Sequence, residues 1–340
     1  MVMDREQEEM QFLGVFGIYK EAHKIVLSFG KIFSQITLAL ILPLSLIFLA
    51  HLEVSNVLLA KITNNEVELD LATKAGTQRY NKLSDHISSE FAYLWLFKAA
   101  YLTLFLIFSL LSTAAVVYTV ACIYTGREVS FNKVMSVVPK VWKRLMVTFL
   151  SIFIAFFAYH VVAFLSFSVA FVAWAVFIGD RPKVLYSFGT VLLVLYFVGL
   201  VYMTVVWQLA SVVSVLEEVC GFKAMAKSRA LIKGNMWMAI FIYFKLNLST
   251  ALVQMAFQKL VVHGVSVDMV SRISYGVICL SLLLGLFLFR LVIETVIYLV
   301  CKSYHHENID KSALSDHLQV YQGEYVPLNS KDVQLEQFYV

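Results

Sequence analysis

The sequence predicts an all-α, polytopic membrane protein built as a bundle of six transmembrane helices. Two observations lead to this fold class. Hydrophobic residues make up 60% of the 340 residues and charged residues only 15%, a composition that a soluble domain would not need. The apolar residues also gather into six long runs separated by short basic segments, and a run of about 20 apolar residues can cross the hydrocarbon core of a bilayer. We therefore expect three membrane hairpins, each preceded by a basic amphipathic helix in the interface.

The boundaries of the expected helices follow from the charges that interrupt the apolar runs. The stretch between Lys98 and Arg127, for example, holds 28 residues without a charge. The first run follows a charged segment and lacks a small-residue cleavage site, which indicates a retained helix rather than a signal peptide. The transmembrane domain is expected at 32–301, between a cytosolic amphipathic segment at 1–31 and a cytosolic tail at 302–340. Its helices are expected at about 32–50, 99–124, 145–178, 185–216, 236–258 and 273–301.

Basic residues are divided unequally between the two sides of this bundle. With six crossings, the side that holds both termini has sixteen Lys and Arg residues, and the other side has nine. Positive charge marks the cytosolic side of a membrane. Both termini are therefore expected in the cytosol, with the protein in the endomembrane system or the plasma membrane. The alternative splits the run at 145–179 into two crossings, which would move the C-terminus across the membrane.

Three basic segments precede the three expected hairpins, at 9–33, 128–145 and 218–236. Glu128 is followed by Lys at the fifth and fifteenth positions, and Glu218 repeats that spacing. Lysines on such a helix reach anionic headgroups while its aromatic side chains bury, although any helix in a headgroup layer shows this pattern. We expect anionic membrane lipids as partners. The candidate lipid-facing residues are Lys133, Lys140, Lys143, Arg144, Lys223, Lys227 and Lys233.

The last hairpin carries charges inside the membrane, where each charge costs about 2.5–3.5 kcal/mol. Lys245 and Asn247 lie on the fifth helix, Arg290 and Glu294 on the sixth, and Gln208 on the fourth. Their distances from the helix ends predict one polar layer in the cytosolic half of the bundle. Glu294 can pair with Arg290 at i,i+4 or with Lys245 on the adjacent helix. The layer is then either a structural clamp or the lining of a cavity, and the cavity would indicate a transporter or channel for an anionic or lipid substrate.

Catalytic and metal-binding motifs are missing from the sequence. It contains no Walker loop, no HExxH and no GxSxG. The four cysteines, Cys122, Cys220, Cys279 and Cys301, have no metal or redox spacing. We expect a protein that is not an enzyme, with no cofactor, no metal site and no direct contact with nucleic acid.

Two resemblances bear on the fold. The stretch EVCGFKAMAKS at 218–228, followed by Lys233, Gly234 and Trp237, is similar to the cytosolic signature of a group that includes the membrane domain of bacterial glycerophosphodiester phosphodiesterases. This similarity implies no catalysis, since the chemistry of those proteins belongs to a separate soluble domain. Over nearly the whole chain the sequence resembles a plant family of uncharacterised six-helix transmembrane proteins, through QFLG at 11–14, LPLSLIFLA at 42–50 and the tail stretch HLQVYQGEYVPL at 317–328. Some members are named for binding poly(A)-binding protein.

The tail contains two short patterns that suggest partners. Leu318, Tyr325 and Pro327 resemble the motif that binds the C-terminal domain of poly(A)-binding protein, with Tyr325 where that motif has Phe and Gln322 where it has a small residue. Such binding would make the protein a membrane tether for an RNA-binding partner. The stretch from Tyr325 to Leu328 also fits the Tyr-x-x-hydrophobic signal that sorting adaptors bind. The third possibility is a tail that folds back onto the cytosolic helices.

Overall fold

The computed structural model describes Met10 and residues 12–71, 78–177, 182–217, 219–264 and 268–305. Within these residues the secondary structure is helical and contains no strand. Six helices are long and apolar enough to cross a membrane, which agrees with the predicted all-α class and with six spans. These spans are Gly30–Leu69, Tyr80–Tyr124, Phe131–Ala173, Ser187–Leu216, Met236–Val262 and Met269–Tyr304.

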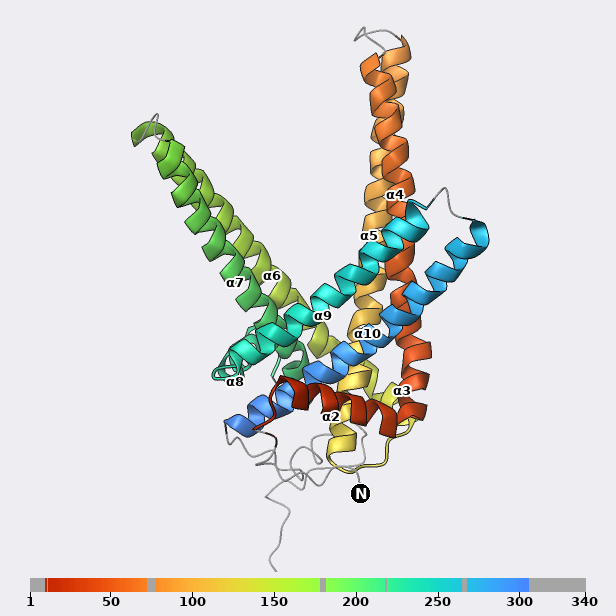
Figure 1. The fold of residues 1–340 in the computed structure, drawn as a ribbon, viewed down its shortest axis with the longest axis vertical. Coiled ribbons are helices and arrows are strands. Elements are labelled where there is room, and N and C mark those ends of the chain that lie inside the picture. Colours follow the sequence, from red (N-terminus) through yellow and green to blue (C-terminus); the bar gives the residue numbers. More distant parts are fainter. Residues whose placement is uncertain are drawn as a thin grey trace, which may run out of the picture.

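Long helices pack in neighbouring pairs (Figure 1): α4 lies along α5, α6 along α7, and α9 along α10. The first two pairs diverge from a shared base, and α2 crosses that base against α10. The described elements are α2 (Val15–Ser28), α3 (Gly30–Ile36), the π-helical turn η1 (Thr37–Ile41), α4 (Leu42–Leu71), α5 (Gln78–Tyr124), α6 (Phe131–Phe177), α7 (Pro182–Leu216), α8 (Phe222–Leu231), α9 (Met236–Phe257), the π-helical turn η2 (Gln258–Val262) and α10 (Met269–Tyr304).

The first pair extends well past the boundaries expected from the apolar runs. The stretch between the expected helices at 32–50 and 99–124 is polar in sequence, and α4 and α5 continue through most of it. A polar contact holds them together, because Glu90, only 6% exposed, forms an ion pair with Lys61 at 3.0 Å and accepts a hydrogen bond from Asn65 at 2.7 Å. Polar residues can therefore remain helical here by pairing across the two helices.

The second basic segment forms no separate helix, unlike the prediction. α6 runs without a break from Phe131 through the whole span. Val134, Val141 and Leu145 are at most 1% exposed, so the basic stretch packs on the same core as the apolar part that follows it. Pro139 lies on the exposed side, where water can reach the backbone carbonyl that proline leaves without a donor. Short helices separate from the spans occur only in the other two segments among the described residues, as α2 and α8.

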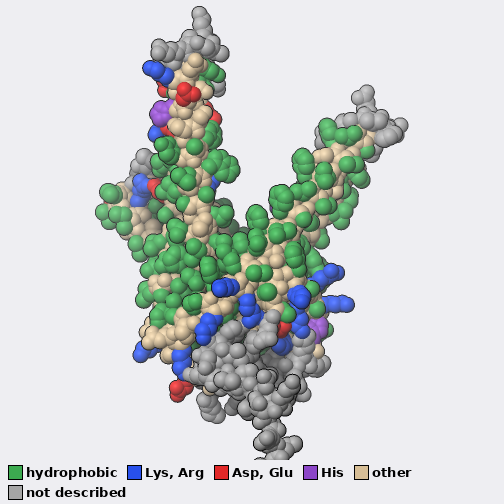
Figure 2. Space-filling model, turned by 180° about the vertical axis from the view of Figure 1, so that it is seen from behind, with side chains coloured by type: hydrophobic (Ala, Val, Ile, Leu, Met, Phe, Trp, Pro, Cys, Tyr) green, Lys and Arg blue, Asp and Glu red, His purple; other side chains and the backbone are tan. Residues whose placement is uncertain are grey.

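The buried core is concentrated at one end of the molecule. The ends of α5 and α7 and the last three turns of α10, where residues 292–301 are all buried, form much of it, and α2, α3, α6, α8 and α9 each contribute buried residues. The distant parts of α6 and α7 instead expose large apolar side chains, such as Phe157 at 64%, Phe164 at 71% and Phe197 at 55%. Such surfaces suit lipid rather than water. Lys and Arg side chains form a band across the core-bearing end, which we call the basic end (Figure 2).

Candidate functional site

Arg290 is the centre of a polar cluster between helices. Its Nε lies 3.0 Å from Glu294 Oε1, one turn further along α10. A second guanidinium nitrogen donates to Asn247 Oδ1 on α9 at 3.0 Å. Gln208 on α7 completes the cluster: its amide is assigned with the nitrogen toward Glu294 Oε1, at 3.2 Å, and the oxygen toward Arg290, since only this orientation pairs donors with acceptors. The cluster therefore ties α7, α9 and α10 together through charge-assisted hydrogen bonds.

The burial of this cluster indicates what it can do. The side chain of Glu294 is 7% exposed, and Gln208 is 8% exposed. Arg290 keeps 25% of its side chain exposed, so the cation is only partly covered. Glu294 has partners from two helices, which is the arrangement expected of a clamp. Tyr243 packs beside it, 2% exposed, with no hydrogen-bond partner for its hydroxyl among the described residues.

Lys245 does not join the other four predicted members of the layer. Its side chain is exposed, and its Nζ lies 4.6 Å from the centre of the Phe241 ring. Lys245 and Asn247 are two residues apart on α9, so their side chains lie on different faces of the helix. Because Asn247 faces Arg290, Lys245 points away from the layer. The pairing of Lys245 with Glu294, one of the two options from the sequence, is not formed in this structure.

A second polar cluster lies at the basic end and was not predicted. The carboxylate of Glu217, just past α7, accepts from the Tyr298 hydroxyl at 2.7 Å and pairs with Lys302 Nζ at 3.4 Å. Arg144 on α6 donates to the backbone carbonyl of Glu217. The residue thus joins α6, α7 and α10. In the sequence Glu217 marked only the end of an apolar run, and nothing else distinguished it from the neighbouring Glu218.

The predicted lipid-facing residues fall into two groups. Lys133, Lys140 and Lys143 on α6 are exposed, as are Lys223 and Lys233 around α8. Lys227 and Arg144 are half-buried, and Arg144 is held by its bond to the Glu217 carbonyl.

Large apolar side chains are exposed at the same end as these cations. Phe16 on α2 and Trp237 at the start of α9 are each 84% exposed, and Phe222 on α8 is 57% exposed. This end of the molecule therefore presents both positive charge and apolar surface to its surroundings (Figure 2).

α8 is anchored to the bundle rather than loosely attached. The buried Ser228 hydroxyl donates to the Val206 carbonyl of α7 at 2.8 Å. A ring nitrogen of His305 lies 3.0 Å from the carbonyl of Leu231. In the turn before α9, Gly234 has φ +102°, and a Cβ there would lie 2.6 Å from the Tyr304 ring. Only glycine fits this turn, so the basic face of α8 has a fixed position.

Two remaining predictions concern the tail and metals. The tail residues Leu318, Tyr325, Pro327 and Leu328 lie outside the described residues. Within the part of the chain that is described, no group of three or more His, Cys, Asp or Glu residues could hold a metal ion.

Comparison with known proteins identifies the family. A family described as "Domain of unknown function (DUF8558)" matches residues 3–338. The chain belongs to this family. No curated protein and no solved structure matches the chain. The family description assigns no activity.

Two features of this DUF8558 chain can carry function. The cluster around Arg290 joins three helices inside the apolar body, and one carboxylate oxygen of Glu294 is held by both Arg290 and Gln208. The basic end combines exposed lysines with exposed aromatic side chains on elements that are fixed to the core. The first feature suits a structural role, and the second suits contact with an external surface.

Proposed function

We propose that this protein is a multi-pass, non-enzymatic membrane protein whose basic end engages anionic lipid on the cytosolic side. The observation that carries the proposal is the joint exposure of Lys133, Lys143 and Lys223 with Phe16 and Trp237 at one end of an apolar bundle. A surface of this composition matches the boundary between headgroups and acyl chains, where lysines meet phosphate and aromatic rings bury.

The membrane arrangement that we propose has three hairpins, formed by α4 with α5, α6 with α7 and α9 with α10. α2 and α8 then lie in the cytosolic interface, and the first turns of α6 take the corresponding place in the middle hairpin. Both termini face the cytosol, in the endomembrane system or the plasma membrane. The excess of Lys and Arg at the basic end supports this orientation.

Electrostatic attraction sets the scale of the effect. Each Lys near an anionic membrane surface contributes about 1 kcal/mol, and the contribution weakens within a Debye length of about 8 Å at physiological salt. When screening by salt roughly halves each contribution, three lysines on one helix face still change the preference for anionic lipid on the order of tenfold. Because the contribution is screened, the preference should also fall as salt rises.

The test measures how strongly phosphatidylserine is enriched around the full-length protein in nanodiscs that contain phosphatidylserine and phosphatidylcholine. The wild type is compared with variants that lack particular lysines. Changing Lys133, Lys140 and Lys143 to Gln should lower the enrichment of phosphatidylserine on the order of tenfold. Arg144 is left intact because it holds the Glu217 carbonyl. The charge-matched control changes Lys82, Lys98 and Lys259 to Gln, and because these lysines lie outside the basic end and do not share one helix face, it should lower the enrichment by less than about twofold. An equal enrichment in wild type and in the first variant would reject the proposal.

The polar layer supports a clamp rather than transport. Glu294 is engaged by Arg290 and Gln208, and Lys245 turns away from the layer. A transporter or channel for an anionic or lipid substrate would need cations that remain available to the substrate, whereas Arg290 already has partners on α7, α9 and α10. The role of the tail as a tether for an RNA-binding partner, or as a sorting signal, stays a prediction because the tail lies outside the described residues.

A further inference from the structure

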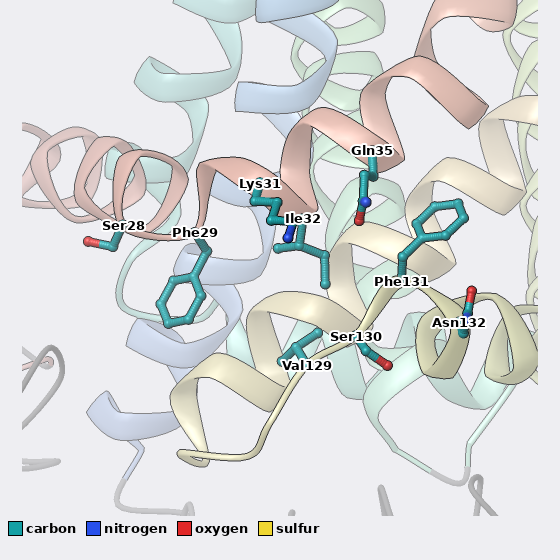
Figure 3. Close-up of a pocket in the computed structure, with 9 residues that line it drawn as sticks. All are labelled: Ser28, Phe29, Lys31, Ile32, Gln35, Val129, Ser130, Phe131 and Asn132. Carbon is teal, nitrogen blue, oxygen red and sulfur yellow. The ribbon is translucent and has the colours of Figure 1, made fainter.

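A cleft of about 510 Å³ opens at the basic end, between the junction of α2 with α3 and the loop that joins α5 to α6 (Figure 3). One wall carries Lys31 and Gln35, and the opposite wall carries Ser130 and Asn132. Phe131 adds an apolar part. The cleft thus combines one cation, several neutral hydrogen-bonding groups and aromatic surface, and no carboxylate is among its lining residues.

Lys31 has no acidic partner among the described residues, so its charge is available to a ligand. It lies at the start of the first apolar run, and Ser130 lies just after the end of the second. The cleft is therefore level with the boundary between the apolar body and water. A phospholipid phosphate occupies that level in a bilayer.

The side chains that follow Lys31 on one helix face are arranged in the order in which a phospholipid would contact them. Gln35 follows Lys31 by four residues, and Leu38, which is 64% exposed, follows by seven. Residues at these spacings share one face of a helix. A cation, an amide and an apolar side chain thus succeed one another from the basic end toward the apolar body. This order matches phosphate, glycerol ester and acyl chain, and a soluble phosphate ester would not use Leu38.

The wall formed by the loop between α5 and α6 is set in place before any ligand arrives. Gly126, with φ +73°, ends α5 in a Schellman motif, with its N–H on the Ile123 carbonyl at 3.2 Å and the Arg127 N–H on the Cys122 carbonyl at 3.0 Å. At the other end of the loop, the Ser130 hydroxyl accepts from the Lys133 N–H at 3.4 Å. Caps at both ends reduce the freedom of the loop, so binding there loses less entropy.

We infer that this cleft is a site for the phosphate headgroup of one anionic phospholipid, with Lys31 facing the phosphate, Gln35 and Asn132 donating to its oxygens or esters, and Leu38 against the acyl chain. The site rests on the proposed function, because it assigns one specific position within the wider lipid-binding surface. The lysines of α6 attract anionic lipid in general, whereas the cleft holds one molecule in a fixed orientation.

The experiment counts lipids bound to the full-length protein in detergent by native mass spectrometry. The probes are dioleoyl phosphatidic acid, dioleoylglycerol, which lacks the phosphate, and glycerol 3-phosphate, which lacks the chains. We expect one phosphatidic acid to remain bound to each wild-type chain, with dioleoylglycerol binding on the order of tenfold more weakly. Glycerol 3-phosphate in equal amount should not displace it.

Two variants test the cleft by different means. Lys31→Gln removes the charge, and Gln35→Trp fills the space without changing the charge, so either result is informative if the other variant fails to fold. Both should weaken phosphatidic acid binding on the order of tenfold. The matched controls are Lys20→Gln, an exposed lysine on α2, and Ser34→Trp, an exposed neighbour that does not line the cleft. Each control should change binding by less than about twofold.

Three results would overturn the site. Equal losses in Lys31→Gln and Lys20→Gln would show a diffuse basic surface, which refutes the cleft and leaves the proposed function standing. Displacement by equal glycerol 3-phosphate would assign the cleft to a soluble phosphate ester instead of a lipid. Wild-type protein that binds phosphatidic acid no better than dioleoylglycerol would refute the cleft and the proposed function together.

Discussion

At the scale of single residues, Glu294 decides the stability of the polar layer. Its carboxylate is buried and receives hydrogen bonds from Arg290 and Gln208. A buried ion pair adds little over an apolar pair of similar size, but the loss of one partner leaves a charge uncompensated in the membrane. Arg290 would then be a partly buried cation with only the neutral side chains of Asn247 and Gln208 as partners.

Glu294→Gln should therefore destabilise the protein by about 2–4 kcal/mol. The measurement is thermal unfolding of detergent-solubilised protein, where this loss lowers the Tm by several degrees. Lys245→Gln is the control with the same size of charge change, and it should shift stability by less than about 0.5 kcal/mol because Lys245 is exposed and lies outside the layer.

A double variant tests whether the layer acts as a simple charge clamp. Replacing the pair with Arg290→Met and Glu294→Leu removes both charges, and it should recover most of the stability that Glu294→Gln loses. If the double variant were as unstable as the single one, the interpretation of the layer as a simple charge clamp would be wrong.

At the scale of helices, the burial of apolar side chains differs strongly between the two ends of α10. Ile297 is completely buried, whereas Ile278 is 54% exposed, although both lie on the same helix and in the same apolar run. The end near Ile297 is therefore packed on all sides, whereas at the other end only one side of α10, through Cys279 and Leu283, packs within the protein and Ile278 lies on the uncovered side. Two identical substitutions on one helix can test this difference.

Ile297→Ala should cost about 2–5 kcal/mol, because it opens a cavity in a closed core. Ile278→Ala should cost less than about 1 kcal/mol, because lipid chains can fill the space. Helix propensity changes equally in the two variants, so it cancels in the comparison. Thermal unfolding of both proteins in the same detergent gives the difference, and equal losses would contradict the placement of the core at the basic end.

The sequence predicted the apolar spans well because length and hydropathy are local properties. It could not predict the continuation of α4 and α5, since that depends on Lys61 and Asn65 meeting Glu90 across two helices. The continuity of α6 was missed for a related reason. The charges near Lys143 suggested a boundary, yet the buried face through Leu145 continues unchanged.

The candidate site was predictable in membership and less so in geometry. Depth along each helix correctly grouped Gln208, Asn247, Arg290 and Glu294, but depth alone does not give the direction in which a side chain points. Lys245 has the right depth and the wrong face. Glu217 escaped notice because its partners come from α6 and α10, far away in the sequence.

At the scale of the whole molecule, the first and last described helices meet at one end. α2 packs against α10, and the rings of Tyr19 and Phe289 stack with their centres 6.1 Å apart. An even number of membrane crossings brings α2 and α10 to the same side, as this contact requires. The alternative with two crossings in the run at 145–179 is not needed, since α6 is one continuous helix through Phe177. Orientation then depends on which face of the membrane the basic end takes.

The positive-inside rule predicts that the basic end faces the cytosol. Single cysteines test this in sealed microsomes, whose outer face is the cytosolic one, after Cys220 is changed to Ser. Lys233→Cys, at the basic end, should react with a membrane-impermeant maleimide at once. Asn64→Cys, exposed on α4 near its far end, should react only after detergent is added. Cys122 and Cys301 are buried and should contribute little background. Reaction of Asn64→Cys in sealed vesicles would reverse the orientation and remove the proposed contact with cytosolic anionic lipid.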